Sequence, residues 1–326
     1  MKLVAADIGG THARFALAEI DAGRVVSLGE AVTLPTANFA SMQTAWEEFG
    51  RQVGDLPPAA AIAIAAAIEG DEIKLTNNPW VIRPSQVNRA LGLDRSVLVN
   101  DFEAVGHAVA QADDDHFVCL CGPKTSLPVE GVVSIIGPGT GLGVSYVLRS
   151  AALGPGGYHV QATEGGHSDF PPLDPIDDAI LERIRLRHRR VSCERMVAGP
   201  AIVDIYEALA ALEGRSVPTR TDRELWTLGL AREDSLAVAA VERFCLSLGS
   251  VAGDVALVQG GSGVVIAGGL GLRIRDTLLA SGFADRFRAK GRFERMMNRM
   301  PVKLLVHPQP GLYGAAAAFA QRHPGD

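Results

Sequence analysis

The chain has 326 residues, 47% of them hydrophobic and 21% charged, and a formal net charge of −6 at pH 7. This length allows two domains with substantial cores, and the composition is typical of a soluble α/β enzyme. The acidic balance argues against nucleic acid or an anionic membrane as the partner. Residues 59–68 form the longest apolar run, about half a membrane span, which favours a buried strand.

The start of the chain and its cysteines predict a cytoplasmic protein. An apolar strand follows Met1 after one lysine, without the pattern of a signal peptide. Of the four cysteines, only Cys119 and Cys121 are closely spaced, and their spacing is not that of a zinc site. We therefore expect reduced, structural cysteines.

Residues 3–17 predict an apolar strand, a Gly9-Gly10 turn and a second apolar strand. Backbone N–H groups at such glycines can face a bound anion, and Thr11 adds a hydroxyl. The Asp7 carboxylate would repel a phosphate unless a divalent cation lay between them, and Mg²⁺ prefers oxygen ligands. A β-hairpin with ordinary Asp-x-Gly turn chemistry explains the same residues, so this stretch alone leaves both interpretations open.

The next segments alternate between helix and strand patterns. Apolar residues at helical spacing from Phe39 to Val53 predict an amphipathic helix, and residues 61–65 predict a strand. After a turn at residues 69–71 and a short strand at 73–75, residues 76–80 form a polar loop that either contacts a ligand or only turns the chain.

Asn100 and Asp101 lie where a predicted strand, residues 96–100, gives way to a helix. Ligands bind at the carboxyl ends of strands in open α/β sheets, so both side chains are candidate ligand contacts. The competing interpretation is that Asp101 only caps the helix.

Residues 132–148 repeat the strand, Gly-Thr turn and strand of the N-terminus, and residues 264–270 form a third apolar run that ends in a glycine pair. The recurrence predicts two similar halves. No Gly-Lys-Ser/Thr follows the glycines, which excludes a P-loop, and Leu142 breaks the spacing of a dinucleotide-binding loop.

The second half contains a loop-rich stretch, residues 154–172, with the sequence Glu164-Gly-Gly-His167. The glycines allow both ionisable side chains to approach a small polar ligand, whereas a zinc site lacks a third ligand at suitable spacing. Residues 177–190 predict a helix whose arginines face solvent, and Glu194 opens another helix, where it could merely complement the helix dipole. Further helices are expected at 202–209, 234–258 and 310–318, and a strand at 302–306.

Taken together, these motifs resemble the bacterial ATP-dependent glucokinase family of the non-ROK type, within the actin-like ATPase and sugar kinase superfamily. The ordered set covers the whole chain: Asp7-Ile-Gly-Gly-Thr-x-x-Arg14, Leu75-Thr-Asn77, Val99-Asn-Asp101, Gly139-Thr-Gly-Leu-Gly143, Glu164-Gly-Gly-His167, Ser192-x-Glu194-Arg195, Ala267-Gly-Gly269 and Pro310-Gly-Leu-x-Gly314. The cysteine-rich zinc motif of the related ROK family is absent. Two positions depart from the family pattern, His12, where Asn is common, and Ala67, where Pro is common.

The resemblance implies an α/β fold of two domains, the actin-like ATPase (ribonuclease H-like) fold. Each domain would be a mixed sheet flanked by helices, with the active site in the cleft between them. Residues 1–112 plus 308–326 would form the small domain, with the first phosphate loop and the catalytic aspartate. Residues 113–307 would form the large domain, with the second phosphate loop and the sugar and adenosine motifs.

The resemblance also implies the roles of the site residues. Asp101 looks like the general base, and the glucose ligands would be Asn77, Asn100, Asp101, Glu164, His167 and Glu194. Asp7 would hold Mg²⁺ through water. The ATP contacts would be Ala6, Asp7, Ile8, Gly9, Gly10, Thr11, Gly139, Thr140, Gly141, Gly268 and Gly269.

The expected activity is therefore that of a glucokinase, which transfers the γ-phosphate of ATP to the 6-hydroxyl of D-glucose. A kinase of another hexose or amino sugar, or a non-catalytic sugar- and nucleotide-binding regulator, remains an alternative at this point. The expected partners are D-glucose and ATP, with no nucleic acid and no membrane, and the resemblance suggests a homodimer.

Overall fold

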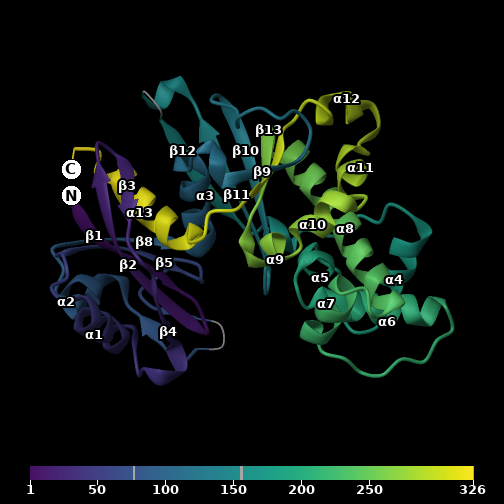
Figure 1. Ribbon diagram of the computed structural model, residues 1–326, viewed down its shortest axis with the longest axis horizontal. Coiled ribbons are helices and arrows are strands. Elements are labelled where there is room, and N and C mark those ends of the chain that lie inside the picture. The colour runs from purple at the N-terminus through teal and green to yellow at the C-terminus, as the bar shows by residue number, and fades with distance from the viewer. Residues whose placement is uncertain (76–77, 155–156, 326) are drawn as a thin grey trace. The chain divides into compact units, whose positions relative to one another are not determined.

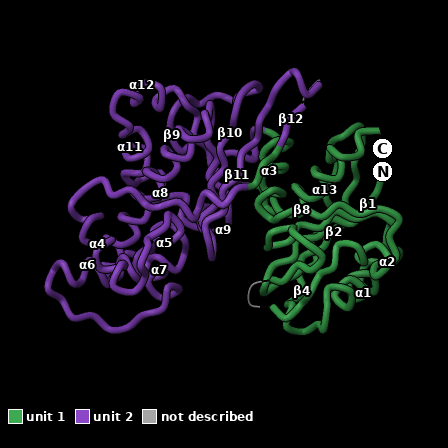
Figure 2. Tube along the Cα trace, turned by 180° about the vertical axis from the view of Figure 1, so that it is seen from behind, with its two compact units in different colours: residues 1–113, 160–162, 307–326 green, residues 114–159, 163–306 purple. Residues whose placement is uncertain are grey.

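The computed structural model describes residues 1–75, 78–154 and 157–325, so the predicted sugar ligand Asn77 lies outside the described residues. The chain divides into two compact units. Unit 1 comprises residues 1–113, 160–162 and 307–326, and unit 2 comprises residues 114–159 and 163–306 (Figure 2).

Unit 1 is built on a mixed sheet whose strands have the order β3-β2-β1-β5-β8, with β4 paired to β2 (Figure 1). Its strands are β1 (Lys2–Ile8), β2 (His12–Asp21), β3 (Arg24–Leu28), β4 (Val32–Pro35), β5 (Ala59–Ile64) and β8 (Arg95–Asn100). β1 and β2 are antiparallel, whereas β1, β5 and β8 are parallel. The carboxyl ends of these three parallel strands therefore meet at one edge of the sheet.

Helices cover both faces of this sheet, and the two faces bury different side chains. The helices are α1 (Met42–Val53), α2 (Val87–Leu91), α3 (Asp101–Gln111) and α13 (Pro310–Arg322), and a small hairpin adds β6 (Ile73–Lys74) and β7 (Val81–Ile82). On the α1 side, Phe15 stacks on Phe49 at 5.3 Å and meets Trp46 edge-on at 6.2 Å. On the α13 side, most buried residues of β5 and α13 are alanines, which let the helix lie close to the sheet.

Unit 2 repeats this plan with the strand order β12-β11-β10-β13-β14-β9. The strands of this sheet are β9 (Phe117–Cys121), β10 (Gly131–Pro138), β11 (Leu142–Arg149), β12 (Tyr158–Thr163), β13 (Gly261–Ile266) and β14 (Val302–Leu305), and residues 160–162 of β12 are those counted with unit 1. β10 and β11 form an antiparallel hairpin, and β13 and β14 continue parallel to β10. A hairpin followed by parallel strands thus occurs in both sheets, which confirms the two similar halves predicted from the sequence.

Helix α8 is the centre of the helical layer of unit 2. The helices are α4 (Pro175–Arg185), α5 (Glu194–Val197), α6 (Ala201–Leu212), α7 (Asp222–Leu230), α8 (Ser235–Gln259), α9 (Gly268–Arg273), α10 (Arg275–Ala280), α11 (Phe283–Arg288) and α12 (Glu294–Met297). Asp234 caps α8 by accepting hydrogen bonds from the N–H groups of Leu236 and Ala237. Among the described residues α8 alone is long and apolar enough to cross a membrane, but 78% of its apolar window is buried inside the protein, as in a core helix.

The predicted helix over residues 177–190 is partly wrong, because α4 ends at Arg185. Beyond Arg185 the chain turns, and two of the arginines that follow form ion pairs with different acidic residues. Arg187 pairs with Asp204 and Glu207, and Arg190 pairs with Asp169. The expectation that the arginines face solvent is confirmed, since Arg183, Arg185, Arg187, Arg189 and Arg190 are all exposed.

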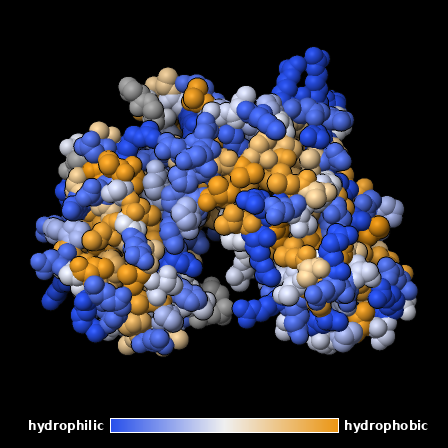
Figure 3. All heavy atoms as spheres, in the orientation of Figure 1, coloured by the Kyte–Doolittle hydropathy of each residue, from blue (hydrophilic) through white to orange (hydrophobic). Residues whose placement is uncertain are grey.

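Hydrophilic and apolar side chains are interspersed over the face seen in Figure 3.

A buried ion network fixes the N-terminal end of α4 to α8 and α11. Asp177 is fully buried, and its two oxygens accept hydrogen bonds from Arg243 at 3.0 Å and Arg286 at 2.6 Å. Arg243 also contacts Asp174, the cap of α4, at 2.8 Å. Since a buried charge without its partner is costly, each member of the network depends on the others.

We expect Asp177→Asn to lower the free energy of unfolding by about 3 kcal/mol, because it removes the fully buried counter-charge and leaves Arg243 and Arg286 with the more exposed Asp174 as their acidic partner. The control is Glu213→Gln, which removes an exposed ion pair with Arg215 and should cost below about 1 kcal/mol. Chemical denaturation of the two variants measures the difference. Equal destabilisation would contradict a structural role for the buried network.

Candidate active site

Asp7 lies near the carboxyl end of β1 and on the same face as Leu3 and Ala5, since alternate residues of a strand share a face. It stands opposite Arg14 of β2, whose guanidinium Nη1 is 3.2 Å from Asp7 Oδ2. Gly311, in the first turn of α13, has no side chain, and a Cβ there would lie 2.8 Å from the same oxygen. Burial raises the pKa of the Asp7 carboxyl, and Arg14 offsets this only in part.

Asp101 follows β8 directly as the first residue of α3. Its pKa is raised to about 6, first because the carboxyl is buried and second because the negative charge of Asp7 is close, although the N–H of Phe102 opposes the shift. The interpretation of Asp101 as the helix cap is wrong. The cap is Asn100, whose Oδ1 accepts hydrogen bonds from the N–H groups of Phe102 at 2.8 Å and Glu103 at 3.2 Å.

The Gly9-Gly10-Thr11 turn joins β1 to β2 and is held by side chains from two other segments. Thr36 Oγ1 donates to the Gly10 carbonyl at 2.8 Å, and Asn78 Nδ2 donates to the same oxygen at 3.2 Å. The Gly9 N–H donates to the carbonyl of His12 at 2.9 Å. That contact uses only backbone atoms, so the departure from Asn at position 12 does not alter it.

The carboxylates of Asp7 and Asp101 influence one another electrostatically, and Arg14 is the cation paired with Asp7. Two neighbouring carboxylates with incomplete charge compensation, next to a turn of glycines, suit a hard divalent cation that keeps some of its water. Asp7, with the negative charge of Asp101 close to it, therefore fits the predicted Mg²⁺. Among the described residues no group of three His, Cys, Asp or Glu side chains could enclose a metal by itself.

In unit 2 the second turn, residues 139–141, joins β10 to β11. The Gly139 N–H donates to the carbonyl of Gly141 at 2.8 Å, and the Gly139 carbonyl accepts from the N–H of Gly199 at 2.7 Å. Gly268, a predicted adenosine contact, has a positive φ of 85°, and a Cβ there would lie 2.9 Å from the carbonyl oxygen of Pro138. The structure thus brings the predicted phosphate and adenosine segments of this unit together.

The predicted sugar residues of unit 2 lie on two segments joined by backbone hydrogen bonds. The Cys193 N–H donates to the Ser168 carbonyl at 2.8 Å, and Phe170 N–H donates to the Val191 carbonyl at 3.1 Å. On the first segment, the side chains of Glu164 and His167 are 84% and 58% exposed and lie 3.8 Å apart. Both are therefore accessible to a small ligand.

Glu194, on the second of these segments, is not free in the structure. Its Oε2 accepts a hydrogen bond of 3.0 Å from the N–H of Leu142, the residue that follows the second turn. A role as dipole complement alone does not explain this contact, because the carboxylate reaches out of its own helix to another loop.

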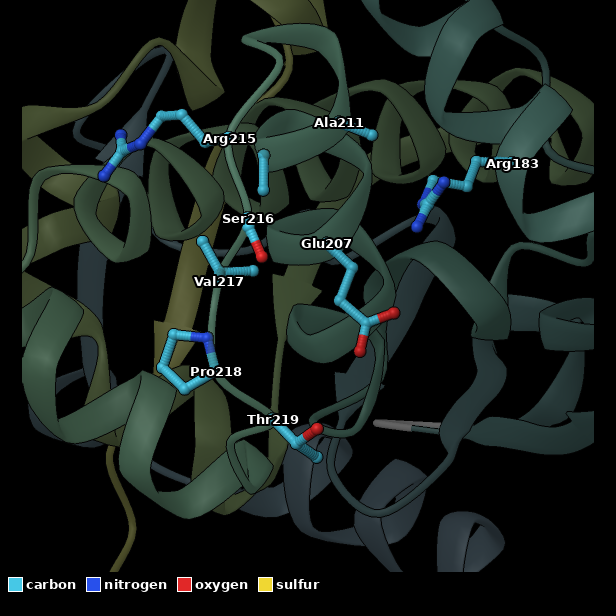
Figure 4. Close-up of a pocket in the computed structure, with 9 residues that line it drawn as sticks. Arg183, Glu207, Ala211, Arg215, Ser216, Val217, Pro218 and Thr219 are labelled. Carbon is cyan, nitrogen blue, oxygen red and sulfur yellow. The ribbon is translucent and has the colours of Figure 1, made fainter.

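Two pockets of about 230 and 270 Å³ lie elsewhere in unit 2. The first is formed by α4, α6 and residues 215–219, and in Figure 4 the Glu207 carboxylate projects into the space between Arg183 and Thr219. Glu207 is already paired with Arg187. No predicted site residue lines either pocket, so neither pocket identifies the site.

Sequence reasoning missed several residues that position the candidate ligands. Thr36 and Asn78 hold the first turn, Gly199 holds the second, and Gly311 gives Asp7 its space. Only Asn78 and Gly311 carried a signal, since Asn78 adjoins the predicted Asn77 and Gly311 is part of a family motif.

The chain is similar to glucokinases over nearly its whole length. A family model described as Glucokinase matches residues 4–322. The glucokinase of Zymomonas mobilis subsp. mobilis is 56% identical over 324 residues, which cover 99% of this chain and 99% of that protein. The crystal structure of a glucokinase from an Antarctic psychrotroph matches with a TM-score of 0.86 and 31% identity, covering 97% of this chain and 98% of that one.

A ROK family glucokinase from Streptomyces griseus, solved in complex with glucose and AMPPNP, matches with a TM-score of 0.63 over 99% of this chain and 100% of that one. At 19% identity this likeness concerns the fold alone. The predicted fold class, that of actin-like ATPases and sugar kinases, is confirmed. With a family model and a relative that both span nearly the whole length, the chain belongs to the glucokinase family.

Proposed function

We propose that this protein transfers the γ-phosphate of ATP to the 6-hydroxyl of D-glucose, giving glucose 6-phosphate and ADP. Membership of the glucokinase family supports this activity. The observation that carries it furthest is the environment of Asp101, a carboxylate at the carboxyl end of a parallel strand with a pKa of about 6. A coupled assay with ATP and a panel of hexoses tests the reaction and the choice of sugar.

Asp101 is the proposed general base. A base works best when its pKa lies near the working pH, and a pKa of about 6 leaves Asp101 ionised at neutral pH yet more basic than an ordinary aspartate. It would take the proton of the sugar 6-hydroxyl as that oxygen attacks the γ-phosphorus and ADP leaves. Asn100 is the cap of α3, and Asp101 Oδ1 accepts one hydrogen bond at the start of this helix, from the N–H of Phe102 at 2.9 Å.

The two glycine turns are the proposed phosphate cradles. The ATP contacts are the first turn, with Ala6 to Thr11, and the second turn, with Gly139, Thr140 and Gly141, while Gly268 and Gly269 would face the adenosine. Asp7 would hold Mg²⁺ through water, and the ion would neutralise charge on the phosphates when bound. With such groups, catalysis would be mainly positioning and charge stabilisation.

The proposed glucose ligands are Asn77, Asn100, Asp101, Glu164, His167 and Glu194. Carboxylates accept hydrogen bonds from hydroxyls, so acidic residues suit a hexose, which presents several O–H donors. Asn100 would contribute less to glucose binding than the other ligands, because its side chain already makes hydrogen bonds within the protein. Its Oδ1 caps α3, and its Nδ2 donates to the Ala66 carbonyl at 3.1 Å. The homodimer, the cytoplasmic location and the division into domains at residue 113 remain predictions.

Asp101→Asn should lower kcat by about 10² to 10⁴ while glucose Kd changes little, because the amide keeps the shape but cannot accept the proton. The fold should not suffer, since the helix cap is Asn100. Steady-state kinetics and calorimetric glucose binding measure the two effects. Asp94→Asn, an exposed site in the same unit, is the control. A turnover close to that of the unmodified protein would remove Asp101 from the catalytic role.

The pH profile should carry the signature of the same group. Because the base must be deprotonated, kcat/KM for glucose should fall as the pH drops below about 6 and stay level above it. Asp101→Asn should lose this acidic limb from its residual rate. A limb centred near pH 4, the ordinary value for an aspartate, would contradict the raised pKa.

Turnover should require a divalent cation. Excess EDTA should abolish turnover, and added Mg²⁺ should restore it. Asp7→Asn should cost far more activity than stability, because burial disfavours the charged Asp7 carboxylate and Arg14 offsets this in part. Asp21→Asn, at the exposed end of β2, serves as the matched control. Full activity in excess EDTA would exclude the metal.

A further inference from the structure

The two oxygens of the Glu194 carboxylate differ in their hydrogen bonding. Oε2 accepts the Leu142 N–H at 3.0 Å, whereas no described residue donates to Oε1. Leu142 begins β11 and directly follows the turn of residues 139–141. The same carboxylate that is proposed to bind a sugar hydroxyl therefore also supports the loop that is proposed to bind phosphate.

The turn of residues 139–141 closes the β10–β11 hairpin, in which Pro138 pairs with Leu142. Beyond this hairpin, the hydrogen bonds that join the turn and Leu142 to other described residues of unit 2 are those of Gly139 to Gly199 and Leu142 to Glu194. On the other side, Gly166 of the Glu164–His167 turn packs on the Leu142 carbonyl, where a Cβ would collide. The Leu142 peptide is thus held between the two sugar segments, by packing on one side and by a charged hydrogen bond on the other.

We propose that Glu194 is a positioning residue for the phosphate loop as well as a sugar ligand, and that it couples glucose binding to nucleotide binding. This inference rests on the proposed function. A sugar hydroxyl on Oε1 orients the carboxylate, and the oriented carboxylate fixes the Leu142 N–H and with it the turn that receives the phosphates. Coupling of this kind is reciprocal, so nucleotide binding must change glucose affinity by the same factor as glucose changes nucleotide affinity.

The structure offers a matched pair of glycines to test this. A Cβ on Gly141 would lie 2.6 Å from Glu194 Oε2, so Gly141→Ala would push the carboxylate aside. The atom displaced is the end of a flexible side chain, and the fold should tolerate the change. A Cβ on Gly139 has only the Gly141 carbonyl near it, at 3.9 Å, so Gly139→Ala alters the same turn without touching Glu194.

Calorimetry of glucose binding without nucleotide is the first measurement. Gly141→Ala should raise the glucose Kd about tenfold, the loss expected for one hydrogen bond to a charged group, whereas Gly139→Ala should stay within about twofold of the unmodified protein. In a Glu194→Ala background, Gly141→Ala should have no further effect on glucose Kd. Equal glucose affinity in the two glycine variants, or additive effects of Gly141→Ala and Glu194→Ala, would overturn the inference.

The second measurement is the affinity for AMPPNP with and without glucose. A purely structural role of Glu194 would not make the AMPPNP affinity depend on glucose. In the unmodified protein glucose should tighten AMPPNP binding roughly fivefold or more, and Gly141→Ala should remove this dependence. If the unmodified protein phosphorylates glucose but shows no such dependence, the inference fails and the proposed function stands. If it neither binds nor phosphorylates glucose, both fail.

Discussion

Parallel pairing of β1, β5 and β8 is the constraint on which the chemistry of unit 1 depends. It places the ends of three strands at one edge and so brings Asp7 and Asp101 within electrostatic reach of each other. In water two neighbouring carboxylates would interact weakly. Burial strengthens the interaction between Asp7 and Asp101 and raises the pKa of both groups. The proposed general base and the proposed metal ligand thus both depend on one strand topology.

The alanine-rich face of unit 1 lets α13 lie close to the edge of the sheet that carries Asp7. The buried alanines of β5 and α13 allow the helix to lie close to the sheet, and its first turn then passes beside Asp7 at Gly311. The positive end of the helix dipole favours a negative charge there. The composition of the core, which sequence reasoning treats as mere packing, therefore contributes to the electrostatics of the candidate metal ligand.

Most of the fold could be predicted from the sequence because its signals are local. The hairpins on either side of Gly9-Gly10 and residues 139–141, the strand that ends at Asn100 and the long helix after Asp234 all follow from apolar periodicity and turn residues. The end of α4 could not be predicted, because residues 186–190 keep a helical composition, and their turn is stabilised by partners distant in sequence, such as Asp204 and Glu207.

The candidate ligands were predicted from family motifs, but the residues that position them were not. Thr36 and Asn78 reach Gly10 from separate segments through single side-chain hydrogen bonds, which leave no periodic trace in the sequence. The cap of α3 could equally be Asn100 or Asp101 by composition, and only the geometry assigns it to Asn100.

The two similar halves differ in how they hold their glycine turns, and this difference carries a functional consequence. The first turn is held by Thr36 and Asn78, which are neutral and have no proposed role toward glucose. The second is held by Gly199 and by the charged Glu194. A neutral support keeps its strength whatever ligand is bound, whereas a carboxylate shared with a ligand does not. If Glu194 binds the sugar as proposed, the repeated architecture therefore provides one turn whose side-chain supports do not depend on the ligand and one whose support is shared with the sugar.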